Sequence, residues 1–485
     1  MHQEKATLQR QLKPMHVWAV AFGCIVGWGS FINPGKKFLP NSGVAGTAIA
    51  MALGALVMII IAFSYAYMVP KYPQAGGEFT FTKMCFGKRA AYVCGWFLVA
   101  AYLTNVPMNS TAIGLIVDGL DGSADILKFG FHYQIAGFDV WLGEMLLAMG
   151  ILILFGLLNI WGVKKAGIVQ SILAALLAAS VFTLTAAALI SSKANGINMH
   201  PIWGFDKSAA LAAGAGAANI SDFAHTGGKG ITSAILATFA IAPWAFVGFD
   251  TIPQTAEEFK FSYKKVSGIM IVAILFGCFV YTANNTVAAA ALTNWPDRVL
   301  AGDWVLLVAA EKLLGTFGKV LVGIAVSCAV LSGIMGFYLA SSRLMYSMSR
   351  DGFLPPAFGK IDKRYGTPKN AMIFCILISL SGPILGREAL GWFVDMSAIG
   401  ASIGYLATCA ATLVTLRRDG DGTPFLKAMA VTGVVFSVIF IVLQLIPIPW
   451  LSGVHFGKES YLMLIVWVAI GAVFYIKERK SFLKA

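Results

Sequence analysis

The sequence has few charged residues. Only 12% of its 485 residues are Asp, Glu, Lys or Arg, whereas 58% are hydrophobic, and the mean hydropathy is +0.76. Apolar runs of roughly 20 residues, long enough to cross the hydrocarbon core of a bilayer as a helix, recur along the whole chain. This composition excludes a soluble globular domain and predicts an all-α integral membrane protein.

Residues that bind metals or do covalent chemistry are also sparse. The seven cysteines and six histidines are scattered, with no C-x-x-C pair and no spacing typical of a metal site. No nucleophile with a neighbouring base stands out. We therefore expect no metal, no cofactor and no enzymatic activity.

The first fifteen residues, MHQEKATLQRQLKPM, lack the apolar core and the small-residue cleavage site of a secretory signal. We expect the first span itself to direct membrane insertion. The net charge is +13, but the basic residues are spread over many loops and form no stripe. We therefore expect no nucleic-acid partner.

Twelve apolar runs predict twelve transmembrane helices. Their ranges are 16–38, 43–69, 89–120, 140–160, 166–191, 230–256, 264–292, 317–348, 370–386, 389–417, 424–447 and 460–476. An even number of spans puts both termini on one side. Assigning the termini and alternate loops to the cytoplasm places most of the 36 Lys and Arg residues there. We therefore predict a multi-pass protein of the plasma or inner membrane with both termini cytoplasmic.

Two of the predicted spans contain helix-breaking residues. FGCIVGWGSFINPG, residues 22–35, has four glycines and a proline, and IAPWAFVGFDTIPQTAEEF, residues 241–259, has Pro243 and Gly248 around an aromatic cluster. Glycines in one span could simply allow close helix packing. Interruptions in the first and sixth spans, at corresponding positions of two halves, instead indicate an inverted-repeat transporter with a cavity in mid-membrane.

A break near Gly27 would expose two kinds of backbone group. The amides that begin the second half-helix favour a carboxylate, and the carbonyls that end the first half-helix accept hydrogen bonds from an ammonium group. Together they suit an amino acid.

Four stretches resemble the amino acid/polyamine/organocation superfamily of permeases. They are GCIVGWGSF (23–31), YPQAGGEFTFTKMCFG (72–87), AFVGFDTIPQTAEEF (245–259) and ASSRLMYSMSRDGFLPPAFGKIDKRYGTPKNA (340–371). They are similar, in order, to the broken helix 1, the loop after helix 2, the helix 6 motif, and the inner end of helix 8 with its loop. The resemblance runs from helix 1 to about helix 10.

The resemblance implies a leucine-transporter-like fold, a 5+5 inverted repeat in which helices 1 and 6 are broken. The implied divisions are a cytoplasmic arm over 1–15, a first repeat over 16–191, an extracellular loop over 192–229, a second repeat over 230–417, and two additional helices with a cytoplasmic tail over 418–485.

The resemblance also implies a substrate site. Amides near Trp28, Gly29 and Ser30 would bind the carboxylate, carbonyls of helices 1 and 6 would bind the ammonium group, and Phe246 would act as a gate. The implied residues are Cys24, Ile25, Gly27, Trp28, Gly29, Ser30, Trp244, Ala245, Phe246, Val247, Gly248 and Asp250. Relatives commonly have a small residue at position 28. The indole of Trp28 would narrow the pocket, pack away from it, or offer a stacking platform.

The coupling ion is left open between a proton and sodium. Many relatives have a helix 5 lysine in the place of a sodium ion, and residues 167–189 contain no lysine. Ser332 with carbonyls near Gly23 and Val26 could form a sodium-like site, unless the hydroxyl only bonds its own helix. Asp250 could carry a proton in a low-dielectric site, or only accept from N–H groups of the half-helix.

Other charged residues cluster near the predicted inner ends of helices 6 and 8. Glu257 and Glu258 are expected to face Lys264 and Lys265, as a cytoplasmic gate or a solvated ion-pair cluster. The helix 8 motif brings Arg343, Arg350 and Asp351, which would serve as anchors or in inner closure. Asn105 and Asp395 are polar residues at membrane depth that receive no role.

These features predict a secondary active transporter, a permease that moves an amino acid across the cytoplasmic membrane by alternating access. Two alternatives remain, a polyamine or amine exchanger of the same fold and a nutrient receptor without transport. The expected partners are an amino acid or amine substrate, the lipid bilayer and a coupling ion.

Overall fold

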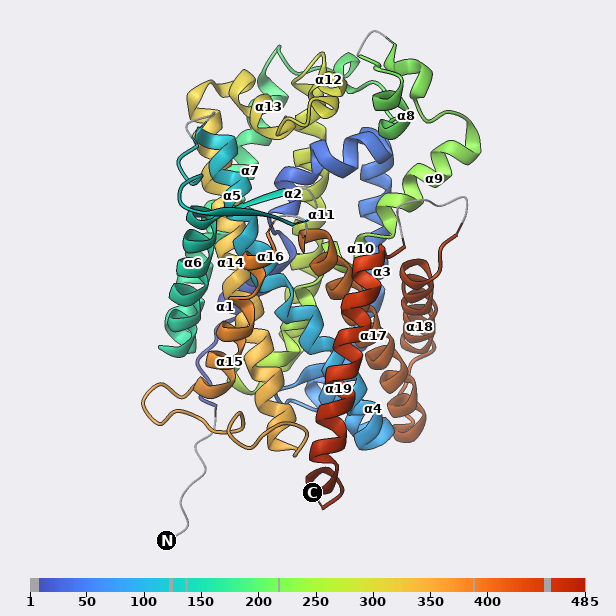
Figure 1. Ribbon diagram of the computed structural model, residues 1–485. Helices are drawn as coiled ribbons and strands as arrows, with labels where there is room; N and C mark the ends of the chain where they lie inside the picture. The colour runs from blue at the N-terminus through green and yellow to red at the C-terminus, as the bar shows by residue number, and fades with distance from the viewer. Residues whose placement is uncertain are drawn as a thin grey trace.

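The computed structural model describes residues 8–121, 125–135, 138–216, 219–386, 389–448 and 455–484. Residues 1–7 of the predicted arm and residue 485 of the predicted tail lie outside this part of the chain. The described chain is a bundle of mostly long helices (Figure 1).

The first half contains seven α-helices, one π-helical turn and a β-hairpin. They are α1 (Pro14–Ile25), α2 (Gly29–Asn33), the π-helical turn (Pro34–Phe38), α3 (Leu39–Lys71), α4 (Gly77–Leu103), α5 (Asn105–Asp121), β1 (His132–Ile135), β2 (Phe138–Trp141), α6 (Leu142–Ile160) and α7 (Val163–Ile190). The two strands are antiparallel, with His132 opposite Trp141.

A connection after α7 leads to the second half of the chain. The connection holds a 3-10 turn (Ile197–Met199), α8 (Lys207–Ala212) and a second 3-10 turn (Ile220–Phe223). The second half has α9 (Gly227–Phe239), α10 (Ala242–Ala245), 3-10 turns η4 (Phe249–Thr251), η5 (Pro253–Glu258) and η6 (Tyr263–Lys265), α11 (Val266–Ala290), α12 (Trp295–Leu300), α13 (Val305–Leu314), α14 (Thr316–Arg350), α15 (Lys369–Ser379), α16 (Gly382–Leu385), α17 (Ala389–Asp419), α18 (Pro424–Leu445) and α19 (Lys458–Lys484).

Within the described residues, ten helical segments are long and apolar enough to cross a membrane, and Pro14–Ile25 and Lys369–Leu385 are shorter apolar segments. Each of the twelve predicted ranges overlaps a helical segment, although 140–160 begins in β2. The prediction of a mostly helical, multi-pass membrane protein is therefore confirmed.

One predicted boundary was wrong. The stretch 72–87 was expected to be a loop and the third span to begin at residue 89, but α4 is helical from Gly77 and bends at Gly87, which has a φ of 80°. Lys83, Lys88 and Arg89 lower the hydropathy of this region, so the pattern of apolar residues hid the start of the helix. The predicted connection 192–229 contains a short helix, α8.

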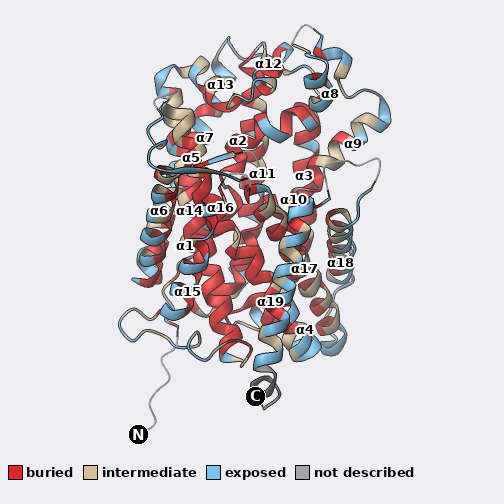
Figure 2. Ribbon diagram, viewed as in Figure 1, coloured by how far each residue is buried: buried red, intermediate tan, exposed pale blue. Residues whose placement is uncertain are grey.

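Burial separates central helices from peripheral ones (Figure 2). α14 packs against α1, α4, α5 and α7, and 72% of its most apolar window is buried, compared with 11% for α19. The exposed side of α19 carries large apolar residues such as Leu462, Ile465 and Val473. An apolar exposed face of this kind suits contact with lipid.

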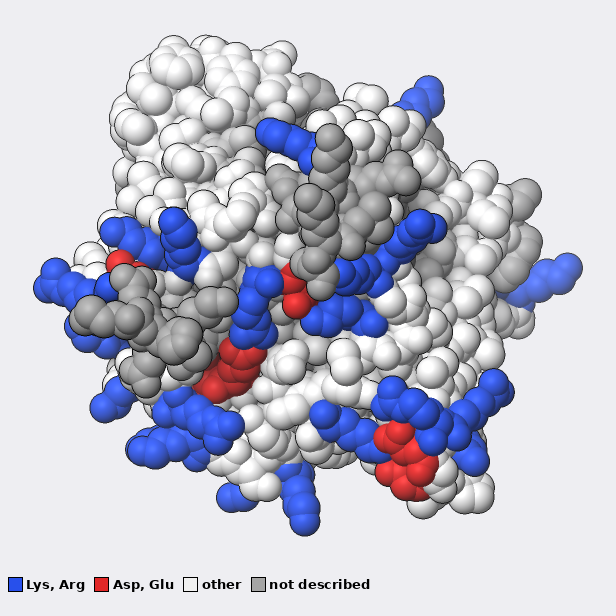
Figure 3. All heavy atoms as spheres, turned by 90° about the horizontal axis from the view of Figure 1, so that it is seen from below, with Lys and Arg blue, Asp and Glu red and all other residues white. Residues whose placement is uncertain are grey.

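The chain just before α1 and the end of α19 lie at the same end of the bundle, called here the lower face, and α8, α12 and α13 lie at the opposite end (Figure 1). Seen from below, the lower face shows many Lys and Arg side chains, with small groups of Asp and Glu between them (Figure 3). An ion pair joins the last residue of α3 to the chain after α17, with Lys71 Nζ 2.9 Å from Asp421 Oδ2.

Two ion pairs tie the end of η5 to α14. Arg343 Nη2 lies 3.0 Å from Glu258 Oε1, and both side chains are completely buried. Arg350 Nη2 lies 2.7 Å from Glu257 Oε1. The expectation that these glutamates face Lys264 and Lys265 was therefore wrong. η5 ends at Glu258, and the chain turns outward before the lysines, which are exposed.

The chain just before α1 packs against the same place. The amide of Leu12 donates to the Glu258 carbonyl at 2.9 Å, and the amide of Lys260 donates to the Leu12 carbonyl at 2.9 Å. The Ala75 amide donates to Glu257 Oε1 at 3.0 Å. These contacts thus link the segments before α1, before α4 and after η5 to one another and, through the glutamates, to the end of α14.

The buried pair gives a stability prediction. Glu258→Gln leaves the Arg343 guanidinium buried without its counter-charge, so we expect a loss of about 3–5 kcal/mol in the free energy of unfolding. Glu257→Gln is the matched control, because Arg350 is 38% exposed and an exposed pair contributes about 1 kcal/mol or less. Thermal unfolding of the detergent-purified variants measures both. Equal losses would contradict the distinction.

Candidate functional site

The first predicted span is interrupted near its middle. α1 ends at Ile25, Val26 takes φ −96° and ψ 82°, and α2 begins at Gly29. Side chains from α11 bond the backbone on both sides of this interruption: Tyr281 Oη donates to the Ile25 carbonyl at 3.2 Å, and Asn284 Nδ2 donates to the Ser30 carbonyl at 3.0 Å. Polar groups of the protein thus replace helical partners at membrane depth.

The sixth predicted span also loses regular α-helix. α10 is a single turn, and Gly248, which follows it, has a φ of 146°. A Cβ at this position would lie 2.7 Å from the Ile25 amide nitrogen and 2.8 Å from the Ala21 carbonyl oxygen. Only glycine fits both this dihedral angle and this contact. The irregular segment of the sixth span therefore touches the end of α1.

A small cavity lies beside the interruption of the first span. Its lining residues are Cys24, Ile25, Gly27, Trp28, Asn105, Met108, Asn109, Trp244, Tyr281 and Phe337. Its volume is about 10 Å³, which is room for about one water molecule. A larger cavity of about 670 Å³ between α3, α7 and α11 has a mostly apolar lining, which does not suit a zwitterion.

Five of the twelve predicted substrate-binding residues line the small cavity. They are Cys24, Ile25, Gly27, Trp28 and Trp244. The others, Gly29, Ser30, Ala245, Phe246, Val247, Gly248 and Asp250, are buried next to it in the same two segments.

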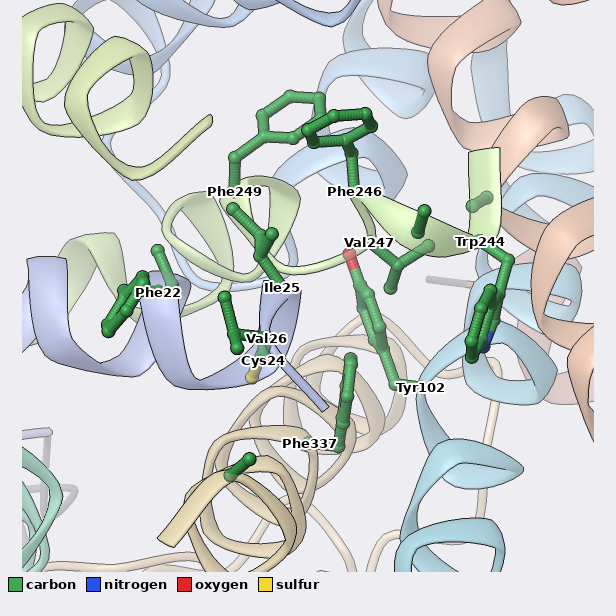
Figure 4. Close-up of a cluster of buried hydrophobic side chains, with 14 of the residues drawn as sticks. Phe22, Cys24, Ile25, Val26, Tyr102, Trp244, Phe246, Val247, Phe249 and Phe337 are labelled. Carbon is green, nitrogen blue, oxygen red and sulfur yellow. The ribbon is translucent and has the colours of Figure 1, made fainter. Parts of the chain in front are cut away.

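Of the two aromatic residues of the sixth span predicted to bind substrate, Trp244 lines the cavity and Phe246 does not. Phe246 packs near Tyr281, with ring centroids 6.3 Å apart, and is completely buried. Its side chain and that of Trp244 leave the segment in opposite directions (Figure 4).

Trp28 narrows the cavity. Its ring lies 6.2 Å from the ring of Trp244, with the two planes tilted by 56°, and its side chain is 6% exposed. A Cβ on Gly29 would lie 2.4 Å from Trp244. The two indoles, one from each interrupted span, thus fill space that a small residue at position 28 would leave open.

Two polar atoms at the cavity have no hydrogen-bond partner among the described residues. They are Nε1 of Trp28, a donor, and Oδ1 of Asn109, an acceptor. Asn109 Oδ1 lies 3.4 Å from the position that a Cβ on Gly27 would take. A buried unpaired polar atom is costly unless a ligand or water completes it.

The two asparagines of α5 were not among the predicted binding residues. Asn109 Nδ2 donates to the Asn105 carbonyl at 2.8 Å, and Asn105 Nδ2 bonds Ser397 Oγ at 2.6 Å. Two amides four residues apart in a membrane helix share one face, and that spacing could have revealed them. Met108, Tyr281 and Phe337 gave no such signal, because their side chains are typical of a packed helix.

A glutamine lies beside the residues of the predicted sodium-like site. Ser332 Oγ bonds the Gly23 carbonyl at 3.3 Å and the Ala329 carbonyl at 3.0 Å. Gln170 of α7 donates its Nε2 to the carbonyls of Ser332 (3.1 Å) and Ala19 (3.2 Å). Gln170 therefore links α1 to α14 beside Ser332. It was not among the predicted coupling residues.

The sequence matches a family model described as amino acid permease over residues 12–473. The branched-chain amino acid permease BcaP of Bacillus subtilis (strain 168) is 23% identical over 491 residues, covering 97% of this chain and 93% of that protein. The large neutral amino acids transporter small subunit 2 of Homo sapiens is 26% identical over 377 residues, covering 77% of this chain and 64% of that protein.

A plant relative, the vacuolar cationic amino acid transporter 2 of Arabidopsis thaliana, is 24% identical over 414 residues, covering 84% of this chain. The chain spans 59% of the length of this relative and 63% of the mitochondrial cationic amino acid transporter 3 of the same plant. These relatives are named as transporters and not as enzymes. The resemblance to permeases is confirmed, and the chain belongs to the amino acid permease family of membrane transport proteins.

Proposed function

We propose that the protein is a secondary active transporter that moves a small neutral amino acid across the cell membrane by alternating access. In this proposal α1–α7 form the first five-span repeat, α9–α17 form the second, inverted repeat, and α18 and α19 are additional. The interruptions after Ile25 and at Gly248 are then the corresponding breaks of spans 1 and 6.

The observation that carries the proposal is the unpaired donor and acceptor at one cavity. A zwitterion has a carboxylate for the Trp28 Nε1 donor and an ammonium group for Asn109 Oδ1. The amides at the start of α2 add partial positive charge on the carboxylate side. One bound amino acid would satisfy both orphan atoms.

The lining supports a neutral and small side chain. None of the ten lining residues carries a charge, so a cationic side chain would lose its hydration without a counter-charge. The two indoles leave little space, so a long side chain would need them to move. Relatives are named for branched-chain, large neutral and cationic amino acids, and this lining favours the neutral class.

The lower face supports the orientation. The chain just before α1, the end of α19 and a gathering of Lys and Arg lie there (Figures 1 and 3), and basic residues favour the cytoplasmic side. We propose that this face is cytoplasmic, and that the contacts of Glu257 and Glu258 with α14 close the path from the site to the cytoplasm. Release inward would require these contacts to separate.

Uptake into proteoliposomes tests the proposal. We expect saturable entry of radiolabelled L-alanine, competed by small neutral amino acids and weakly by L-arginine or putrescine, because the lining has no acidic side chain. Stronger competition by putrescine would indicate an amine exchanger. Binding without flux would indicate a receptor, and a conductance that does not saturate would indicate a channel.

A substitution tests the role of the Trp28 donor. Trp28→Phe keeps an aromatic ring but removes Nε1, and a hydrogen bond to a charged group contributes about 1.5–3 kcal/mol. We therefore expect the KM for L-alanine to rise roughly 10- to 100-fold. Trp18→Phe is the matched control, because Trp18 Nε1 is also buried without a partner among the described residues but lies outside the cavity lining. Equal effects of both substitutions would contradict the assignment.

A further inference from the structure

Two carboxylic acids are buried together behind the candidate site. Glu78 from the start of α4 and Asp250 from η4 are both completely inaccessible to solvent. Tyr102 of α4 lies between them, with its Oη 3.3 Å from Glu78 Oε1 and 3.1 Å from Asp250 Oδ2. Neither acid has an Arg, Lys or His within ion-pair distance among the described residues; the buried Arg343 is paired with Glu258.

The other partners of the two acids are neutral. Tyr65 Oη donates to Glu78 Oε1 at 2.8 Å, and Gln254 Nε2 donates to Glu78 Oε2 at 2.6 Å. The Gly248 amide donates to Asp250 Oδ1 at 2.7 Å. Asp250 thus bonds the irregular segment that touches the end of α1, while Glu78 lies at the start of α4, toward the lower face.

The other titratable groups that face the two acids come from α1, α3, α17 and α4 itself. Tyr65 belongs to α3, Tyr405 to α17, Cys24 to α1, and Cys94, like Tyr102, to α4. All are phenols or thiols, which carry no positive charge in any protonation state. Nothing among these groups can offset two negative charges, and two ionised carboxylates in a low-dielectric interior repel strongly.

The hydrogen bonds around Tyr102 also indicate that one of the two acids is protonated. The single hydroxyl hydrogen of Tyr102 faces three acceptors, Glu78 Oε1, Asp250 Oδ2 and the Asp250 carbonyl, the last also at 3.1 Å. One hydroxyl can donate only once. One more proton, on either acid, lets the hydrogen bonds run in sequence through Tyr102, from the protonated acid to the ionised one.

We propose that Glu78 and Asp250 form a shared-proton site, and that this site is where the transporter binds its coupling proton. The inference rests on the proposed transport function and gives it a coupling ion and a location. It differs from the helix 5 lysine that many relatives have, because residues 167–189 contain no lysine.

The proton moves without any other reactant. When Asp250 is the protonated acid, its Oδ2–H bond breaks as an O–H bond forms on Tyr102, and the former Tyr102 hydrogen leaves to form an O–H bond on Glu78 Oε1. Asp250 becomes ionised, Glu78 becomes neutral and Tyr102 is unchanged. One proton has passed from the break at Gly248 toward the start of α4, and the reverse transfer returns it.

Proton movement with substrate tests the proposal in proteoliposomes that contain a pH-sensitive dye. With the wild-type protein, external L-alanine should acidify the interior. Glu78→Gln cannot hold a proton, so we expect loss of this acidification and retention of alanine counterflow, which exchanges labelled for unlabelled alanine without net proton movement. Retained counterflow also shows that the variant is folded.

Two phenol variants form a matched pair. Tyr102→Phe breaks the hydrogen-bonded sequence between the acids, so acidification by L-alanine should be lost. Tyr405→Phe removes a nearby buried hydroxyl that has no hydrogen-bond partner among the described residues, so acidification should match the wild type. Wild-type acidification in Glu78→Gln, or equal loss in both phenol variants, would overturn the proposal.

Failure of coupling and failure of transport are distinguishable. Alanine uptake by the wild type without acidification would overturn the shared-proton site and leave the proposed function intact. If none of the tested amino acids and amines is transported, the proposed function fails. Infrared spectra still test whether Glu78 and Asp250 share a proton. The carbonyl stretch of a buried, protonated carboxylic acid should be present in the wild type and absent in Glu78→Gln or Asp250→Asn. Its absence in the wild type would overturn the pair.

Discussion

Backbone polar groups inside a membrane must find partners within the protein, and the central region depends on this constraint. Where α1 stops at Ile25, the helix leaves carbonyl and amide groups without helical partners, and no water is available in lipid to replace them. Tyr281 and Asn284 of α11 supply part of what is missing. Trp28 Nε1 and Asn109 Oδ1 remain without partners among the described residues at the same cavity. Unpaired polar atoms at membrane depth suit a polar ligand.

The two irregular segments contact each other directly. Gly248 is packed against the end of α1 so closely that a methyl group would not fit, and the indoles of Trp28 and Trp244 meet at the cavity. The same segment places Asp250 against the Gly248 amide. In the two proposals, substrate recognition and proton binding share this segment, so a backbone change at Gly248 would act directly on Asp250.

Sequence patterns were sufficient for the membrane class, the helical ranges and the family, because hydropathy and the helix 8 motif are strong local signals. They were not sufficient for residues whose role depends on a distant partner. Glu78 lay in a stretch expected to be a loop. Gln170 bonds carbonyls of two other helices, those of Ala19 and Ser332. Glu258 was matched with nearby lysines, whereas its partner, Arg343, is 85 residues away. Such pairings are created by folding, and no local pattern contains them.

Ligands that lack one end of the zwitterion test the central claim most directly. Binding of L-alanine, propionate and alanine methyl ester to the purified protein can be compared by calorimetry. Propionate has no ammonium group for Asn109 Oδ1, and the ester has no carboxylate for Trp28 Nε1 and the α2 amides. We expect L-alanine to bind and both analogues to bind much more weakly than L-alanine. An analogue that binds as tightly as L-alanine would contradict it.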